Sequence, residues 1–187
     1  PLDVVVGIPA HAHSGQRFLT LEAFRRAGFK VITMINEPSA AGFEYAHRHS
    51  SMLNSKRTKV LVYDLGGGTF DASLVSADGK HHEVLASNGN NLLGGDDFDQ
   101  ALAEIAATSA GTSLAALDAH VRADVLDSAR AAKESLHPQS RFMTVAIEDS
   151  TVSIPVADYY DAVAPLVDET IRSMNPLLVR ADEGDLK

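Results

Sequence analysis

The sequence element that decides the fold is Asp64-Leu65-Gly66-Gly67-Gly68-Thr69-Phe70-Asp71, which lies between two apolar, strand-like segments. Three glycines in a tight turn allow backbone N–H groups to approach an anion closely. Thr69 offers a hydroxyl group to a phosphate, and the flanking Asp64 and Asp71 favour Mg²⁺ held through water beside it. A Walker A loop is excluded, because that loop needs Gly-Lys-Ser/Thr at the start of a helix. A plain glycine hairpin is the alternative, but it needs neither three glycines nor flanking carboxylates.

Two further segments carry candidate chemistry. In residues 36–41, Asn-Glu-Pro-Ser-Ala-Ala, Glu37 ends a predicted strand and precedes the positive N-terminus of a predicted helix. A carboxylate there orients a water molecule, contacts a hydrated metal, or only caps the helix. In residues 93–99, Leu-Gly-Gly-Asp-Asp-Phe-Asp, glycines at the start of a helix form a second anion site or a plain helix cap. The residues alone leave these alternatives open.

Histidine pairs and an acidic cluster are weaker signals. His11/His13 and His47/His49 are each two residues apart, and imidazole binds Zn²⁺ or Ni²⁺ readily. No further ligand stands out in the sequence, so solvated histidines are favoured. The acidic residues of 96–99 lack the spacing of a calcium loop, so helix capping is favoured there.

The composition excludes several classes of protein. The chain has 187 residues, with 25 Asp and Glu against 16 Lys and Arg, and a net charge of −9. This acidic balance argues against a nucleic-acid-binding surface. No run approaches the ~20 apolar residues of a membrane span. The sequence has no Cys, which excludes thiolate zinc sites and thiol catalysis, and fits a reducing compartment. We expect a cytoplasmic protein.

The hydrophobic pattern predicts a mixed α/β protein. The first half reads as strands at 4–8, 31–35, 60–63, 70–76 and 82–87, with helices at 17–27 and 38–48 and a linker at 49–57. Asp78-Gly79 predicts a hairpin, so strands from 60 to 87 form an antiparallel meander after a βαβα start.

The second half reads mainly as helix. One helix is expected from about residue 94, and a second carries Leu114, Leu117, Val121 and Val125 and stops at Pro138. A β-hairpin spans 143–154, and a last helix starts near Val156, with an apolar stripe from Val163 to Met174 that we expect to face the core. A part of this stripe without a partner would expose an apolar patch.

Taken in order, the motifs resemble one known pattern. It consists of Ile-Pro-Ala (8–10), Gln-Arg (16–17), Asn-Glu-Pro-Ser-Ala-Ala (36–41), the octapeptide 64–71, Leu-Ala-Ser-Asn-Gly (85–89) and Leu-Gly-Gly-Asp-Asp-Phe-Asp (93–99). The combination resembles the seventy-kilodalton heat-shock chaperone family of the DnaK type. The resemblance covers almost the whole chain and is densest from Pro9 to Asp99. Sugar kinases and actins share the ATPase fold but not this combination of motifs.

The resemblance implies an incomplete actin-like ATPase (ribonuclease H-like) α/β fold of two lobes around a nucleotide cleft. Residues 1–51 would be the rear part of lobe I, and 52–93 with 176–187 parts of the base of lobe II. Residues 94–175 would be the helical cap subdomain of lobe II, carrying a β-hairpin. The family's first phosphate loop, its catalytic lysine and its closing Gly-Gly segment do not occur in the sequence. We therefore expect a fragment that alone hydrolyses ATP negligibly, and the abrupt start at Pro1 suggests the same.

The resemblance also implies roles for single residues. The phosphates of ATP or ADP would be bound by Gly66, Gly67, Gly68, Thr69 and Gly95. The implied catalytic residues are Glu37, Asp64, Thr69 and Asp71, of which the three carboxylates would act on Mg²⁺ through water and on the attacking water. The adenosine would be contacted by Arg130, Lys133, Glu134 and His137. Coupling to a peptide-binding domain would involve Pro9 and Arg17.

Several positions depart from the family's pattern. His11-Ala12-His13 replaces an aromatic pair after Pro-Ala, and Leu92 stands where a His is common. Arg130 and His137 occupy adenosine-segment positions that are commonly Glu and Ser in the family.

The function implied is that of the ATP-binding and ATP-hydrolysing domain of a chaperone that couples nucleotide state to binding and release of unfolded polypeptide. The implied partners are unfolded clients, held by a missing peptide-binding domain, a J-domain co-chaperone and a nucleotide exchange factor, with no nucleic acid and no membrane. The first alternative is a non-catalytic docking module for co-chaperones, which the altered adenosine segment fits. The second is an actin-like or sugar-kinase relative.

Overall fold

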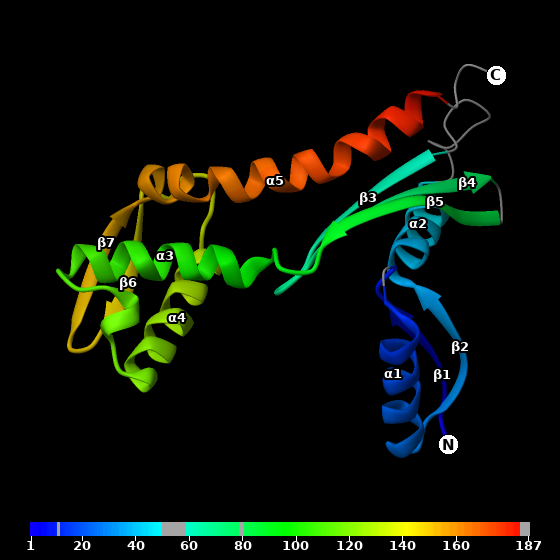
Figure 1. Cartoon of the computed structure of the whole chain (residues 1–187), viewed down its shortest axis with the longest axis horizontal. Coiled ribbons are helices and arrows are strands. Elements are labelled where there is room, and N and C mark those ends of the chain that lie inside the picture. The colour runs from blue at the N-terminus through cyan, green and yellow to red at the C-terminus, as the bar shows by residue number, and fades with distance from the viewer. Residues whose placement is uncertain (11, 50–58, 79–80, 184–187) are drawn as a thin grey trace. The chain divides into compact units, whose positions relative to one another are not determined.

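The computed structural model describes residues 1–10, 12–49, 59–78 and 81–183, and shows the mixed α/β protein that the pattern predicts (Figure 1). The chain divides into two compact units. Unit 1 consists of Pro1–Asp64, Phe70–Asn90 and Ser173–Lys187, and unit 2 of Leu65–Thr69 and Asn91–Arg172. The predicted turn at Asp78-Gly79 and nearly all of the predicted linker at 49–57 fall outside the described residues.

Unit 1 begins with a parallel strand pair. β1 (Asp3–Ile8) and β2 (Lys30–Asn36) run side by side, with Ile8 opposite Asn36 at their carboxyl ends. Parallel strands need a crossover, and α1 (Ser14–Arg26) provides it along the strand pair (Figure 1). The pairing therefore places Glu37, the residue after β2, at the carboxyl edge of this sheet.

Local signals set both ends of α1. Its first turn is a capping box: the His13 N–H donates to Gln16 Oε1 at 3.0 Å, and the Gln16 N–H donates to His13 Nδ1 at 3.4 Å. Gly28 follows the last turn at φ +87°, a left-handed conformation that favours glycine. The helix is thus three residues longer at its start than the predicted 17–27.

The second sheet of unit 1 has the strand order β3 (Lys59–Leu65), β4 (Phe70–Asp78), β5 (His81–Asn90). β4 and β5 are antiparallel, as the predicted meander requires. Consecutive residues Ala72 to Val75 are all buried, so both faces of the central strand are covered.

Helix α2 (Glu37–Arg48) packs in unit 1 through a glycine. A Cβ atom at Gly42 would lie 3.0 Å from Cγ1 of Val75 on β4, so a larger residue would require the Val75 side chain to shift by a few tenths of an ångström. The C-terminal part of α5 (Val156–Glu183) also belongs to unit 1 from Ser173 onward. Its Ser173 carbonyl accepts a hydrogen bond of 2.8 Å from the Asn88 side chain.

Unit 2 has a helical core closed by a hairpin. It contains α3 (Gly95–Ser109), α4 (Ala119–Glu134), the first part of α5, and the antiparallel strands β6 (Phe142–Ile147) and β7 (Ser150–Pro155) (Figure 1). Its core residues include Leu102, Ala106, Val125, Val145, Ile154 and Val163. This core brings the N-terminal turn of α3 and the C-terminal half of α4 into one unit.

One sequence prediction in unit 2 is wrong, and a second holds only in part. The single helix expected through Leu114 and Val125 is a 3-10 turn at Leu114–Ala116 followed by α4, because Leu117 is extended and Asp118 starts a new helix by accepting from the His120 N–H. The α5 stripe faces the core only in part: Val163 is buried, but Val167 is 40% exposed and Ile171 46% exposed. Both lie beyond Leu166, the last α5 residue in contact with the core cluster.

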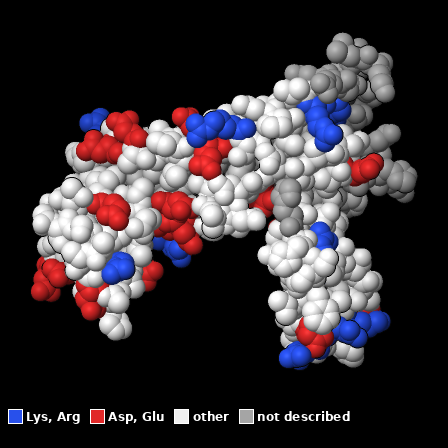
Figure 2. Space-filling model, in the orientation of Figure 1, with Lys and Arg blue, Asp and Glu red and all other residues white. Residues whose placement is uncertain are grey.

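The net charge of the chain belongs to unit 2. This unit contains 14 Asp and Glu and 5 Lys and Arg, whereas unit 1 contains 11 of each class. On the face that Figure 2 shows, most of the acidic side chains lie over the elements of unit 2. No helix in the described ranges is both long and apolar enough to cross a membrane.

Candidate functional site

The glycine loop, Gly66–Thr69, is a tight turn in unit 2. The Gly66 N–H donates to the Thr69 carbonyl at 2.8 Å and closes the turn. Within the described part of the chain, the N–H groups of Gly67, Gly68 and Thr69 donate to no other group of the protein. All three residues are exposed. The loop therefore presents three N–H donors and the Thr69 hydroxyl, which is donor chemistry suited to an anion.

The N-terminus of α3 is bound to this loop. The Gly95 N–H donates to the Gly66 carbonyl at 2.8 Å, and the Asp96 N–H donates to the Gly67 carbonyl at 2.7 Å. A Cβ atom at Gly94 would lie only 2.4 Å from the Gly67 oxygen, so the two backbones touch where only glycine fits. The N–H groups of Gly95 and Asp96 therefore donate to carbonyl groups of the loop. The N–H groups that can still bind an anion are those of the loop itself.

Three carboxylates of unit 1 lie near one another. Glu37 opens α2, while Asp64 and Asp71 come from the neighbouring strands β3 and β4. Partial burial, and then the negative charges of Asp64 and Asp71, raise the pKa of Glu37 above its ordinary value. Three neighbouring negative charges make this group of carboxylates a favourable place for a cation.

This carboxylate group suits a hydrated cation better than a directly bound one. Within the described ranges, no three His, Asp or Glu side chains converge closely enough to hold a metal ion directly. A Mg²⁺ ion usually keeps several of its waters, so carboxylates that contact those waters are compatible with it. The donor chemistry of these residues is thus compatible with Mg²⁺ bound through water, and their role in holding the ion stays a prediction.

Asp99 joins two helices of unit 2 through two cations. Its side chain is 3% exposed, and its oxygens lie 2.7 Å from Lys133 Nζ and 3.0 Å from Arg130 Nε. Arg130 also reaches Asp96 at 2.5 Å, and Lys133 donates to the Gly95 carbonyl at 2.9 Å. The hydrogen bond to Asp99 is the main cause of the raised pKa of Arg130. Two predicted adenosine contacts are thus bound to the first turns of α3.

The sequence reading missed Asp99 and Gly94 as structural contacts. It interpreted the acidic cluster as helix caps, and only Asp97 caps α3, by accepting from the Gly94 N–H at 2.8 Å. A signal was available in Arg130 and Lys133, which are three residues apart and therefore on one face of a helix. Their acidic partners lie more than 30 residues away, and spacing alone does not pair them.

The remaining predicted residues lie apart from this network. Glu134 is the last residue of α4, and His137 follows it, both exposed. Pro9 is exposed after β1. Arg17 donates to Asn36 Oδ1 at 3.2 Å and to the Ala12 carbonyl at 2.8 Å, so it ties α1 to the end of β2, next to Glu37.

The histidines show no metal site in the described residues. His13 caps α1, His49 stacks on Tyr45 with ring centroids 4.5 Å apart, and His47 stacks on Phe43. His11 is outside the described residues.

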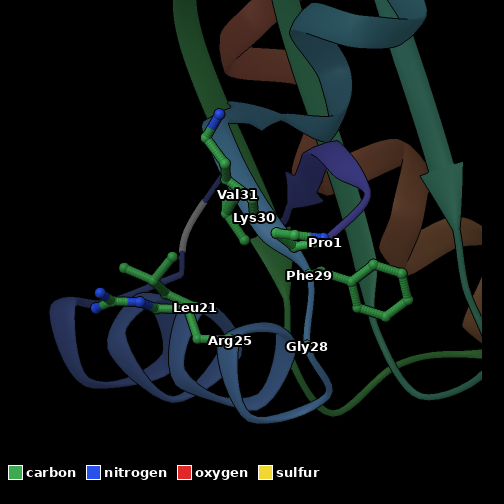
Figure 3. Close-up of a pocket in the computed structure, with 7 residues that line it drawn as sticks. All are labelled: Pro1, Leu21, Arg25, Gly28, Phe29, Lys30 and Val31. Carbon is green, nitrogen blue, oxygen red and sulfur yellow. The ribbon is translucent and has the colours of Figure 1, made fainter.

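Unit 1 also contains a separate cavity of about 520 Å³ beside α1 and the start of β2 (Figure 3). The cavity is lined by the apolar side chains of Leu21, Phe29 and Val31 and by two basic residues, Arg25 and Lys30. None of the predicted phosphate or magnesium residues lines it.

Comparisons with known proteins agree with these motifs. The sequence pattern of the Hsp70 protein family matches residues 2–182, so the chain belongs to the Hsp70 family. It is 38% identical over 96% of its length to the chaperone protein HscA of Escherichia coli. It is 38% and 37% identical, over 91% and 93% of its length, to HscA homologues of Shewanella denitrificans and Methylibium petroleiphilum. The chain spans 27% to 29% of the length of these relatives.

Proposed function

We propose that the chain is part of the ATP-binding and ATP-hydrolysing domain of a chaperone. The observation that carries this proposal is the glycine loop, whose three exposed residues Gly67 to Thr69 present N–H donors that pair with no other described group, together with the Thr69 hydroxyl. The chain belongs to the Hsp70 family, and its relatives are named as chaperones. An anion-binding turn of this kind suits the phosphates of a nucleotide. The actin-like fold, the division into lobes and the helical cap subdomain belong to the same proposal.

The loop and the carboxylates have different proposed roles: the loop binds phosphate, and the carboxylates bind hydrated Mg²⁺. Gly66 to Thr69 bind the β- and γ-phosphates, with Gly95 behind the loop. The carboxylates of Glu37, Asp64 and Asp71 hold hydrated Mg²⁺ through water and orient the attacking water. The Mg²⁺ ion, when bound, neutralises charge that develops on the phosphates. Glu134 and His137, which are exposed, contact adenosine, and Arg130 and Lys133 do so from their places on α4.

The proposed partners follow from the relatives, which are named as chaperones. Unfolded polypeptide would be the client of the whole protein, with a J-domain co-chaperone and a nucleotide exchange factor as regulators. Pro9 and Arg17 would pass on the nucleotide state, since Arg17 ties α1 to the strand end that precedes Glu37. A cytoplasmic location is part of this proposal.

A non-catalytic docking module is the second candidate. One observation favours it: both cations expected at the adenosine, Arg130 and Lys133, are engaged by Asp99. Such a module would bind co-chaperones without any affinity for nucleotide, so nucleotide binding separates the two candidates.

A thermal-shift titration with ADP tests the proposed function. We expect Mg²⁺-dependent stabilisation that follows RT ln(1 + [L]/Kd) for the chain, and none with Gly67→Val. A Cβ atom at Gly67 would have Asp96 Oδ1 as its nearest neighbour at 3.9 Å, so the first atom of the new side chain fits the free fold. The valine would occupy the space of the phosphate instead. Adenosine without phosphates is the ligand control, and its binding should differ little between the two proteins.

The outcomes are distinct. Equal ADP stabilisation of both proteins would place the phosphates elsewhere. An absence of stabilisation in both would mean either that the loop alone does not suffice in a chain that spans 27% to 29% of its relatives, or that the chain is a docking module. The same titration of the whole protein separates these two readings, because a docking module has no affinity for nucleotide there either.

A further inference from the structure

Asp99 is a buried carboxylate that two helices share. Burial of a carboxylate is costly unless cations and donors compensate for the lost water. Here Lys133 and Arg130 compensate, at 2.7 Å and 3.0 Å, and both come from α4. Unit 2 has only five basic residues against 14 acidic ones, yet two of the five converge on this single side chain.

A short path of contacts links Asp99 to the glycine loop. Lys133 Nζ bridges Asp99 and the Gly95 carbonyl, at 2.7 Å and 2.9 Å. The N–H of Gly95 in turn donates to the Gly66 carbonyl at 2.8 Å. Every contact of this path lies within unit 2. The position of Lys133 is therefore coupled to the backbone that carries the loop donors.

Arg130 neutralises the Asp96 carboxylate, which lies beside the glycine loop. The Asp96 carboxylate lies 3.9 to 4.0 Å from where Cβ atoms of Gly67 and Gly68 would be, at the side of the loop. An uncompensated carboxylate there would repel an anion. Arg130 pairs with Asp96 at 2.5 Å and is held in that position by its second contact with Asp99.

We propose that Asp99 is a positioning residue for phosphate binding. Through Lys133 it holds the first turn of α3 against the glycine loop, and through Arg130 it keeps the Asp96 charge neutralised beside the loop. This inference rests on the proposed function, because the anion in question is the phosphate group of a nucleotide. It assigns Asp99 a role that neither helix capping nor calcium binding includes.

The test compares Asp99→Asn with a variant of the same unit that only loses stability. Asp118→Ala removes the N-cap of α4, where Asp118 Oδ1 accepts from the His120 N–H at 2.9 Å, without touching the loop. Two quantities are measured well below both melting temperatures: the Kd for Mg²⁺-ADP, and hydrogen exchange at the Gly95 and Asp96 amides. We expect Asp99→Asn to raise the Kd at least tenfold and to speed exchange of both amides at least tenfold. Asp118→Ala should change each less than threefold.

Two cation variants separate the two parts of the mechanism and cover the case in which Asp99→Asn does not fold. Lys133→Met should reproduce the fast exchange of the Gly95 amide. Arg130→Met should weaken Mg²⁺-ADP binding while that amide stays protected.

Each result is decisive. If Asp99→Asn and Lys133→Met both behave like Asp118→Ala in Kd and exchange, the positioning role is overturned. If the unmodified chain binds no Mg²⁺-ADP, the phosphate role of Asp99 fails together with nucleotide binding by this chain. Fast exchange of the Gly95 and Asp96 amides in Asp99→Asn would then still show that Asp99 holds the first turn of α3 against the glycine loop, as a purely structural role.

Discussion

Gly94 is the position where the glycine loop and α3 are closest, and Gly94→Ala tests whether that contact sets the loop. The added Cβ atom would lie 2.4 Å from the Gly67 oxygen and 2.6 Å from the carbonyl carbons of Gly67 and Gly68. All three are backbone atoms, so no flexible side chain can move aside. The loop has to retreat from the helix by about 1 Å to restore a normal van der Waals distance.

The cost follows from that displacement. The hydrogen bonds from the Gly95 and Asp96 N–H groups to the loop, now 2.8 and 2.7 Å, would be lost at about 1 kcal/mol each. Gly94 has φ −163°, an extended conformation open to alanine, and the substitution recovers about 0.5–1 kcal/mol of chain entropy. The net loss is about 1–1.5 kcal/mol, which corresponds to a fall of roughly 4–12 °C for a small cooperative unit.

The assay is calorimetry combined with hydrogen exchange, and Gly67→Ala is the matched control. The same substitution at Gly67 meets no atom closer than 3.9 Å, so it should leave the melting temperature of unit 2 within about 2 °C. Only Gly94→Ala should expose the Gly95 and Asp96 amides to fast exchange. Equal melting temperatures for the two variants, with both amides protected in Gly94→Ala, would refute the reasoning.

Two titratable groups give further predictions. A raised pKa means that Glu37 binds its proton more tightly in the folded state, so its contribution to stability is complete below pH 4.5 and falls as the pH rises through the raised pKa. Urea unfolding should therefore show Glu37→Gln more stable than the parent at pH 7 and equal to it at pH 4; a constant difference at both would contradict this. Burial, with the charges of Asp99 and Tyr160, raises the pKa of Tyr159 to about 12, so stability should fall above pH 10. Absorbance titration should show one of the four tyrosines ionising near pH 12, and Tyr159→Phe should lack that step.

Much of the local structure follows from short-range signals in the sequence. The glycine turn, Glu37 between a strand and a helix, and Asp97 as a cap all depend on residues within a few positions of each other. The break before α4 was missed because Leu114, Leu117, Val121 and Val125 keep a helical spacing through a segment in which Leu117 is extended. Hydrophobic spacing records which residues are buried, and two short helices can bury the same residues as one long helix.

The family, the mixed α/β class and the glycine-rich turn could all be predicted from the sequence, because motifs, periodicity and glycine content are local properties of the chain. Tertiary structure decided which cations neutralise which carboxylates. Arg130 and Asp99 are 31 residues apart, and only the packing of α4 on α3 brings them to 3.0 Å. The same packing leaves no room for a Cβ atom at Gly94, whereas a Cβ atom at Gly67 meets nothing closer than 3.9 Å. Close approach between distant backbones depends on how whole helices pack, and no pattern of neighbouring residues records that distance.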